Sequence, residues 1–268
     1  MRTGLPLLIL LLWGGAALLA PLLPLNPDHI DLQQILAAPG GGVWLGSDDL
    51  GRPIVDRLVM GARTSFFVAV GVVLISALLG TLLGAFAGYA GGAADQLLVQ
   101  VIDIFLAFPG ILLAIALAGV MGPGMDNVII ALSVVGWVGY ARLARAQVLS
   151  LKQRDHVAAA VALGTGRGTI VMRHLLPLIA SPLIVEATFG IASMVIAEAG
   201  LSFLGLGVQP PAASWGSMIR DGARYMLVAP HMVLAPGIAV MLVVLAVNLL
   251  GDRLRDTMDV RLLGKRSA

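Results

Sequence analysis

The chain has 268 residues, of which 59% are hydrophobic and 12% are charged, whereas about a quarter of the residues in soluble domains are charged. This composition excludes an ordinary soluble domain and indicates that most of the chain lies in a lipid bilayer. The sequence has no cysteine, which excludes disulfides, thiolate metal sites and cysteine nucleophiles. Its net charge of +2 is too small to indicate binding to nucleic acid.

Long apolar stretches predict an all-α polytopic membrane protein, because a helix needs about 20 apolar residues to cross the hydrocarbon core. We expect six spans, at residues 5–24, 66–90, 97–121, 127–148, 177–199 and 232–251. The fourth has only 15 uncharged residues, 127–141, and reaches full length if Arg142 and Arg145 extend toward the membrane surface.

The spans divide the chain into three predicted parts. A first transmembrane helix occupies residues 1–24, an extracytoplasmic segment occupies 25–65, and the main transmembrane domain occupies 66–268. A secretory signal over residues 1–23 is the alternative for the first part. Leu18 disfavours it because a small residue is wanted there, and Pro21 would follow the cleavage point.

Lysine and arginine are unevenly distributed between alternate loops, which predicts the orientation of the chain. With the amino terminus inside, the cytoplasmic set is Arg2, Arg142, Arg145, Lys152, Arg154, Arg167, Arg173, Arg253, Arg255, Arg261, Lys265 and Arg266. The outer set is Arg52, Arg57, Arg63, Arg220 and Arg224. The bias predicts that both termini and the segment 150–177 lie in the cytoplasm.

Residues 200–231 form a long outer segment that contains several helix-breaking residues. Gly205, Gly207, Pro210, Pro211 and Gly216 interrupt a stretch that is uncharged for 20 residues from Gly200. We expect an ordered extracytoplasmic flap or re-entrant element, and a seventh, broken span is the alternative. Its candidate site residues are Gly205, Gly207, Trp215 and Gly216.

Motifs for ATP hydrolysis and for common enzymatic chemistry are absent from the sequence. There is no Walker phosphate loop, no His-Glu-x-x-His and no Gly-x-Ser-x-Gly. The stretch Gly164–Gly168 follows an alanine-rich helix, whereas a phosphate-binding loop follows a strand. We therefore expect a chain that is no enzyme and that holds neither a metal nor a cofactor.

Three acidic residues lie within predicted spans, where an ionisable group is costly and usually has a partner or a function. Asp103 lies in the third span, and Glu186 and Glu198 lie in the fifth. Each has two interpretations: a partner for a group on a neighbouring helix or subunit, or a polar lining of a translocation path. Glu186 and Glu198 are about 18 Å apart along a helix, so they cannot form one site. Glu198 should lie near the outer mouth.

The cytosolic segment 150–177 has the composition of a docking surface. Residues 155–163 are rich in alanine and predict a short helix, which Gly164, Gly166 and Gly168 then interrupt. A second short helix resumes at Thr169, before Pro177 opens the fifth span. Small side chains let another surface approach the backbone closely, and the arginines here, Arg154, Arg167 and Arg173, offer contacts to carboxylates.

This segment resembles the coupling loop, or EAA loop, of the permeases of ABC importers. The family pattern is Glu-Ala-Ala, three residues, Gly, and about a dozen residues to Leu-Pro. Matching positions are Ala158, Ala159 and Ala160, then Gly164, then Leu176 and Pro177. Ala158 departs from the pattern because the family usually carries glutamate there, which leaves docking to the small face, Gly164, Arg167 and Asp155.

Other stretches resemble one branch of that family, the C-type permeases for dipeptides, oligopeptides and nickel. The outer stretch 44–66 resembles the branch's Gly-Thr-Asp-x-Leu-Gly-Arg-Asp pattern, with Ser47 and Pro53 as departures. Residues 103–115 and 199–219 resemble its third span and its scoop-like outer loop. The resemblance covers residues 44–259, most of the chain.

The resemblance implies an ABC importer type I permease in a bacterial or archaeal plasma membrane. Implied partners are a second homologous permease, two cytosolic ATPases that bind ATP and Mg, and an extracytoplasmic binding protein. Implied substrates are dipeptides and oligopeptides, with nickel or a nickel chelate as the alternative. From a different class, a proton-coupled secondary transporter remains the distant alternative.

Overall fold

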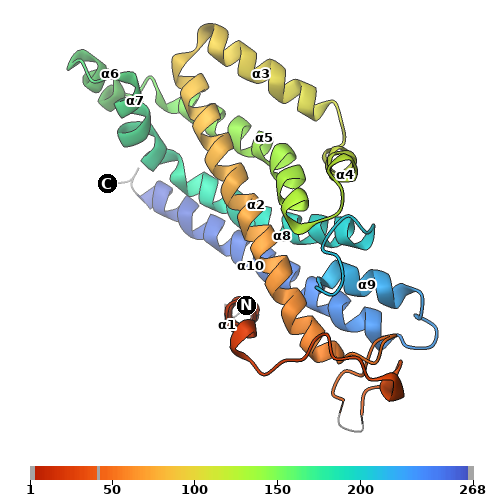
Figure 1. The fold of residues 1–268 in the computed structure, drawn as a ribbon. Coiled ribbons are helices and arrows are strands. Elements are labelled where there is room, and N and C mark those ends of the chain that lie inside the picture. Colours follow the sequence, from red (N-terminus) through yellow and green to blue (C-terminus); the bar gives the residue numbers. More distant parts are fainter. Residues whose placement is uncertain (1–3, 41–42, 265–268) are drawn as a thin grey trace. The chain divides into compact units, whose positions relative to one another are not determined.

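The structure is a computed structural model that describes residues 4–40 and 43–264, with side chains described as far as Met258. These residues are mainly helical, and the loops between them contain two isolated β-bridges. The main helices are α1 (Gly4–Leu19), α2 (Ile54–Ala90), α3 (Gly92–Leu106), α4 (Gly110–Met121), α5 (Met125–Leu151), α6 (Asp155–Ala162), α7 (Arg167–Thr169), α8 (Leu176–Phe203), α9 (Trp215–Ala223) and α10 (His231–Gly264) (Figure 1). The predicted all-α class is confirmed. Arg2, Lys265 and Arg266, which the orientation argument used, lie outside the described residues.

Five helical stretches of the described chain are long and apolar enough to span a membrane. They are Gly4–Leu22, Ile54–Ala90, Met125–Leu151, Arg167–Phe203 and His231–Met258. A sixth span exists if α3 and α4 together cross the bilayer. These stretches correspond to the six predicted spans, although several boundaries differ.

The predicted third span, 97–121, is broken in the structure. Helices α3 and α4 are bent by 83° at the interval between Leu106 and Gly110. Pro109 lies in this interval, and proline disfavours helical backbone in the residue before it. The apolar pattern predicted the end of this stretch at Met121 correctly, began it five residues late, since α3 starts at Gly92, and missed its bend.

The second span begins 12 residues earlier than the sequence predicted, at Ile54 instead of residue 66. Asp56, Arg57 and Arg63, which were assigned to the outer segment, therefore lie on α2. The outer segment before this helix ends at Pro53. The extension is possible because the Arg57 side chain is paired with carboxylates, as described below, and is only 4% exposed.

The last span is longer than predicted, because α10 continues from His231 to Gly264 instead of ending at residue 251. The fifth span also differs, since residues 167–203 form one continuous helical stretch. Within it, residues Ile170–Leu175 adopt π-helical geometry immediately before α8. Pro177 has no N–H to donate to the carbonyl four residues earlier, which gives a local reason for the wider turn there.

The chain divides into two compact units, each built from three separate stretches. The first contains the residues up to Gly71, with Ile115–Ala131 and Ile191–Leu250. The second contains Val72–Ala114, Leu132–Gly190 and the residues from Gly251 onward. Several long helices contribute residues to both units, so neither unit is a separate domain in sequence.

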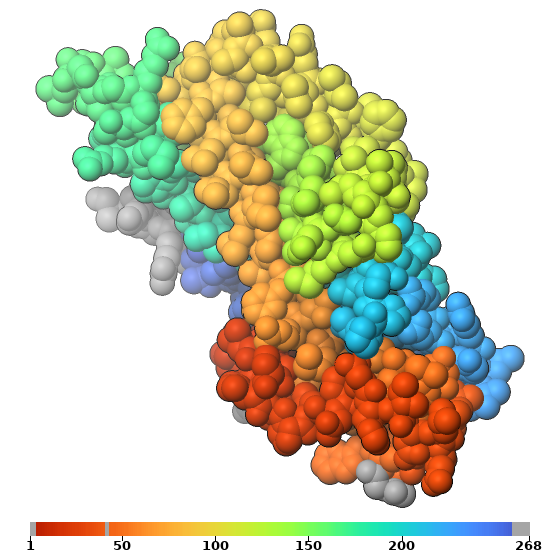
Figure 2. All heavy atoms as spheres, viewed as in Figure 1, coloured from red at the N-terminus to blue at the C-terminus, as the bar shows by residue number. Residues whose placement is uncertain are grey.

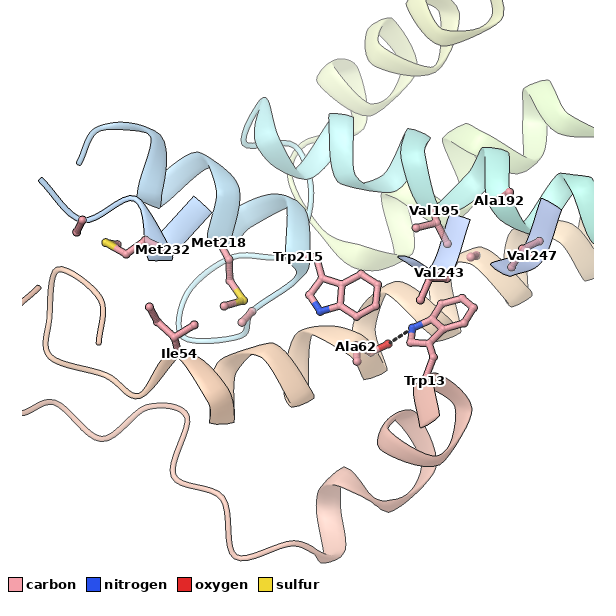
Figure 3. Packing of buried hydrophobic residues seen from close by; sticks show 13 residues of the cluster. Trp13, Ile54, Ala62, Ala192, Val195, Trp215, Met218, Met232, Val243 and Val247 are labelled. Atoms are coloured by element: carbon pink, nitrogen blue, oxygen red, sulfur yellow. Dashed lines mark hydrogen bonds between the residues drawn. The ribbon is translucent and has the colours of Figure 1, made fainter. Parts of the chain in front are cut away.

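The core of the first unit is built around two tryptophans. Trp13 of α1 and Trp215 of α9 stack with ring centroids 6.2 Å apart (Figure 3). Their indole N–H groups donate to backbone carbonyls of α2, Trp13 to Ala62 at 3.2 Å and Trp215 to Leu58 at 3.0 Å. Burial of the indoles with their polar ends satisfied fixes α1 and α9 on the N-terminal part of α2.

In the second unit, α2 packs on α5 through a row of glycines. Gly80, Gly84 and Gly88 recur every four residues, so they lie on one face of the helix. A side chain at Gly84 would meet the backbone of Ala141, and one at Gly88 would lie 3.2 Å from the carbonyl oxygen of Arg145. The small residues therefore allow the two helices to approach closely, as in other membrane helix pairs.

Candidate functional site

The first candidate site is the element formed by α6, α7 and the turn between them, which the sequence predicts to lie in the cytoplasm. Helix α6 ends in a Schellman motif: Gly164 N–H donates to Val161 O at 2.9 Å and Thr165 N–H donates to Ala160 O at 3.0 Å. Gly164 has φ of +76°, in the left-handed region that favours glycine. The expected interruption at this residue is confirmed, and the turn is hydrogen-bonded.

Contrary to the sequence prediction, Gly166 and Gly168 do not interrupt the helix together with Gly164, and each has a different role. Gly166 is the N-cap of α7, with φ of −63° and ψ of 147°. Gly168 lies inside α7, so it does not interrupt the chain. The segment is thus a short helix, a tight turn and a helix that continues into α8.

Helix α6 has one buried face and one exposed face. Val157 and Ala160 are buried in a cluster of the second unit that includes Val148 of α5 and Ile170, Val171 and Leu175 of the π-helical stretch. Asp155, Ala158, Ala159, Gly164, Arg167 and Pro177 are exposed. Ala160 is the expected docking residue that the structure buries, because the third residue of the triplet falls on the inner face of the helix.

The exposed face of this element includes large apolar side chains beside its charged ones. Leu163 is 85% exposed and Val161 is 54% exposed, although both lie next to a turn of small residues. In Figure 2 the green atoms of α6 and α7 form a projection beside the ends of α2 and α3 of the same unit. Apolar surface presented on a short, internally braced projection is suited to a protein partner.

The three acids expected in the spans have different environments. Asp103 and Glu186 are exposed on the surface of this chain. Glu198 is only 2% exposed and accepts hydrogen bonds from Ser65 Oγ at 2.9 Å and Ser202 Oγ at 2.7 Å. For Glu198 the structure therefore provides partners within the chain itself, on α2 and α8.

The outer loop after α8 is ordered and packs closely on that helix. A side chain at Gly207 would meet Ser202, and one at Gly216 would meet the backbone of Ala199. Helix α9 begins with a capping box between Ser214 and Ser217 and has nine residues. Nine helical residues extend about 14 Å, too short to cross the hydrocarbon core, so the alternative of a seventh span is wrong.

Gly205 and Trp215, which also belong to this loop, have structural roles. Gly205 has φ of +86°, which a glycine adopts without strain. Trp215 is only 3% exposed because it packs in the core of the first unit. The four loop residues singled out from the sequence therefore shape and anchor the loop.

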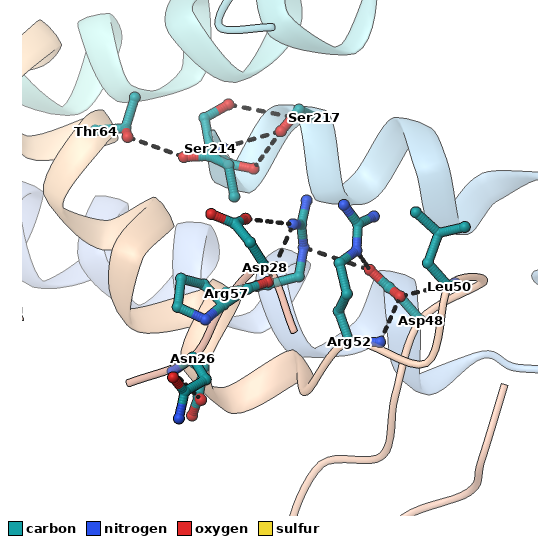
Figure 4. A network of polar contacts seen from close by, with 12 residues as sticks. Asn26, Asp28, Asp48, Leu50, Arg52, Arg57, Thr64, Ser214 and Ser217 are labelled. Atoms are coloured by element: carbon teal, nitrogen blue, oxygen red, sulfur yellow. Dashed lines mark hydrogen bonds and ion pairs between the residues drawn. The ribbon is translucent and has the colours of Figure 1, made fainter. Parts of the chain in front are cut away.

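The sequence did not predict a network of ion pairs that surrounds Asp48 in the predicted outer segment. Asp48 accepts the backbone N–H of Leu50 and of Arg52, each at 2.9 Å, and its other oxygen lies 2.7 Å from Arg52 Nε (Figure 4). That oxygen is also 3.4 Å from Nε of Arg57, whose Nη1 lies 3.8 Å from Asp28 Oδ1. Asp48 and Arg52 of the outer motif thus form a buried ion-pair cluster with a structural role.

Gly51 and Asp49 are neighbours of this ion-pair cluster and belong to the same outer motif. Gly51 has φ of +76°, and a side chain there would collide with the carbonyl of Asp31. Asp49 has a raised pKa, because burial disfavours its charged form and the nearby Asp48 carboxylate adds to that effect, while Arg52 opposes it. One oxygen of Asp49 is buried without a hydrogen bond among the described residues.

A bidentate ion pair connects α3 to α5 in the second unit. Arg145 Nε lies 2.5 Å from Asp95 Oδ1, and its Nη2 lies 2.8 Å from Asp95 Oδ2. The sequence predicted that Arg145 extends toward the membrane surface, and the structure adds that its guanidinium is paired with Asp95. The arginine within a short apolar span was the signal in the sequence for this ion pair. Its partner, Asp95, lies 50 residues away in the chain.

Among the described residues no group of three or more His, Asp or Glu side chains is placed to hold a metal ion. The arrangement comprises apolar helices of spanning length, a braced helical projection at one end of the second unit and an ordered loop layer in the first. It is the arrangement of a multi-pass membrane protein that presents a folded projection.

Comparison with known proteins identifies the family of this membrane protein. Residues 80–263 match the family described as "Binding-protein-dependent transport system inner membrane component". The chain belongs to this family, and it is a multi-pass inner-membrane permease of the ABC importer type. Membership implies ATPase and binding-protein partners, and it removes the secondary transporter as an alternative.

Three curated relatives confirm the branch. The chain is 41% identical to the glutathione transport system permease protein of Pectobacterium atrosepticum, over 96% of this chain and 85% of the relative. It is 43% identical to the dipeptide transport system permease protein of Alkalihalophilus pseudofirmus, over 85% and 75%. It is 41% identical to the nickel transport system permease protein of Escherichia coli K12, over 90% and 87%.

A solved structure shares the fold at lower identity. The inward-facing MetNI methionine ABC transporter matches with a TM-score of 0.60 and 20% sequence identity, over 76% of this chain and 97% of that chain. The expected ABC importer permease fold is confirmed.

Proposed function

We propose that the chain is the non-catalytic permease subunit of an importer for dipeptides and short oligopeptides. It forms the translocation path together with a second homologous permease, while two cytosolic ATPases bind ATP and Mg and a binding protein delivers the substrate. The relatives named for glutathione, itself a tripeptide, and for dipeptides support the peptide class. The relative named for nickel supports the second candidate, a nickel or nickel-chelate importer.

The observation that carries the proposal is the exposed, braced element of α6 and its turn. Ala158, Ala159 and Gly164 are exposed, so a cleft in an ATPase could approach the backbone closely. Asp155 and Arg167 provide charged contacts at the two edges of this surface. Ala158 lacks the carboxylate usual in the family, and docking therefore depends on shape and on burial of Leu163.

The packing of α6 explains how docking would act on the membrane helices. Val157 and Ala160 share a cluster with α5 and with the helical stretch that leads through Pro177 into α8. Displacement of α6 therefore moves α5 and α8, because a packed cluster transmits displacement. Nucleotide binding would favour an outward-facing arrangement and hydrolysis an inward-facing one, as a shift between two populations.

The orientation follows from the same assignment. The side that carries α6 is cytoplasmic, so both termini lie in the cytoplasm and the ordered loop at 200–231 faces the binding protein. Asp103 and Glu186 are exposed on this chain, and in the proposed complex they would face the second permease or the path. Glu198 acts within the chain, since its carboxylate already accepts two serine hydroxyls.

A substitution at the docking surface tests the coupling. Gly164→Trp should abolish uptake while the complex remains in the membrane, because nothing lies within 4 Å of the added Cβ and the indole would instead meet the ATPase. Ala158→Glu is the matched comparison and should retain uptake, because it restores the family pattern. Normal uptake by a stably inserted Gly164→Trp complex would contradict the docking role.

The substrate is tested by ATPase activity of the complete reconstituted complex. We expect stimulation when the binding protein is loaded with short peptides. Stimulation by chelated nickel alone would move the assignment to the nickel importer, and the architecture would be unchanged.

A further inference from the structure

We infer that a groove in the first unit binds both charged ends of a short peptide during transport, with Arg63 at its carboxylate and Asp28 at its ammonium group. The inference rests on the proposed function and adds a binding site to it. The groove has a volume of about 490 Å³. It is formed by α2 between Met60 and Phe67, the start of α5 at Met125 and Ile129, and the loop residues Pro27, Asp28, Ala212 and Ala213. Small-molecule sites are commonly about 300–1,000 Å³.

Arg63 is the cationic group of the groove, and it keeps most of its donors available. Its Nη1 makes one long contact, 3.5 Å, to the carbonyl of Ala17, and its Cζ lies 5.2 Å from the ring centroid of Phe67. No carboxylate of the described residues lies within ion-pair distance of it. By contrast, Arg52, Arg57 and Arg220 each contact an aspartate. A half-buried guanidinium beside an aromatic ring is suited to a carboxylate ligand.

Asp28 is the anionic group, and it also retains capacity for a ligand. Its side chain is 54% exposed, and its ion pair with Arg57 is long, at 3.8 Å. Arg57 is held more closely by Asp48, at 3.4 Å. The third polar lining group, the Thr64 hydroxyl, already donates to Ala213 O at 2.9 Å. The groove thus offers one cationic group without a carboxylate partner and one anionic group held only by a long ion pair, as a zwitterion requires.

The apolar lining explains why the ligand is a peptide of variable sequence. Met60 and Met125 are unbranched and flexible, and methionine-rich surfaces adapt to different side chains. Phe67 and Ile129 add apolar surface. Two charged contacts for the constant termini and an adaptable lining for the variable side chains together match a short peptide better than a hydrated metal ion, which would require oxygen or nitrogen ligands.

The test uses the complete complex in nanodiscs with its binding protein and a dipeptide of alanine followed by photo-leucine. After vanadate trapping and illumination, we expect the label on residues 60–67 or 125–129. Arg63→Gln and Asp28→Asn should each raise KM for uptake about tenfold to hundredfold, the range for loss of one hydrogen bond to a charged group. Both should also lower labelling of the groove. Arg63→Lys should recover part of each effect because it keeps the charge.

Arg255→Gln is the matched control, because Arg255 is an exposed arginine of α10 that neither lines the groove nor belongs to the loop 200–231, and it should leave KM and labelling unchanged. Met60→Trp, which fills the groove without removing a charge, should also block labelling. Wild-type uptake with label only on the partner permease would overturn the inference and leave the peptide importer standing. Absence of peptide-stimulated ATPase activity in the wild type would instead overturn the proposed function.

Discussion

Gly164 provides the sharpest test of how the docking element is built. Its backbone has φ of +76°, and it closes the Schellman motif at the end of α6. The space around it is open, since a Cβ at this position would have no atom within 4 Å. Replacement by alanine therefore changes the backbone preference and adds no steric clash within the chain.

The magnitude follows from the left-handed conformation alone. An ordinary L-residue there costs about 1–2 kcal/mol, which lowers the population of the closed turn about 5- to 30-fold. Gly164→Asn should cost less, because asparagine visits this region more readily than alanine. Gly166→Ala is the matched control: the backbone of Gly166, with φ of −63° and ψ of 147°, lies in a region open to all residues.

Hydrogen exchange and coupled uptake measure the effect. The amide of Thr165, which donates to Ala160 O, should exchange faster in the order glycine, asparagine and alanine at position 164. Uptake per ATP hydrolysed should fall in the same order, while Gly166→Ala remains like the wild type. Equal protection of Thr165 in all three forms, or equal damage from Gly166→Ala, would refute the reasoning.

Three other predictions concern packing and charge. Gly84→Ala should cost about 1–3 kcal/mol through overpacking against α5, seen as a lower melting temperature of the purified complex, whereas Gly71→Ala, with nothing within 4 Å, should have little effect. A double-mutant cycle of Asp95 and Arg145 should give a coupling of about 1–3 kcal/mol, and exchange of the two charges should restore more stability than either single reversal. Asp49 has a raised pKa in the folded chain, so its contribution to stability is fully present below the ordinary value of 3.8 and is lost as the pH rises through the folded value. Asp49→Asn should flatten the dependence of melting temperature on pH in that window, and an unchanged pH profile would contradict the burial of this carboxyl.

Local sequence signals were sufficient for much of the candidate docking element. Alanine-rich residues before Gly164 predicted both the short helix and its termination, because helix propensity and left-handed backbone depend on residues close in sequence. The prediction for Ala160 was wrong in detail. Which face of a short helix is buried depends on Val148 and Ile170, and neither is a neighbour of Ala160 in the chain.

By itself the sequence determined the fold class, the stretches long and apolar enough to span a membrane, and the family, since apolar length and motif order are properties of contiguous residues. Tertiary structure alone decided where charged residues find partners. Arg57, in the first turns of α2, meets Asp48, and Arg145 of α5 meets Asp95. The groove around Arg63 likewise combines four stretches that are distant in sequence. A charge is costly in an apolar medium until a partner approaches, and that approach depends on packing between helices.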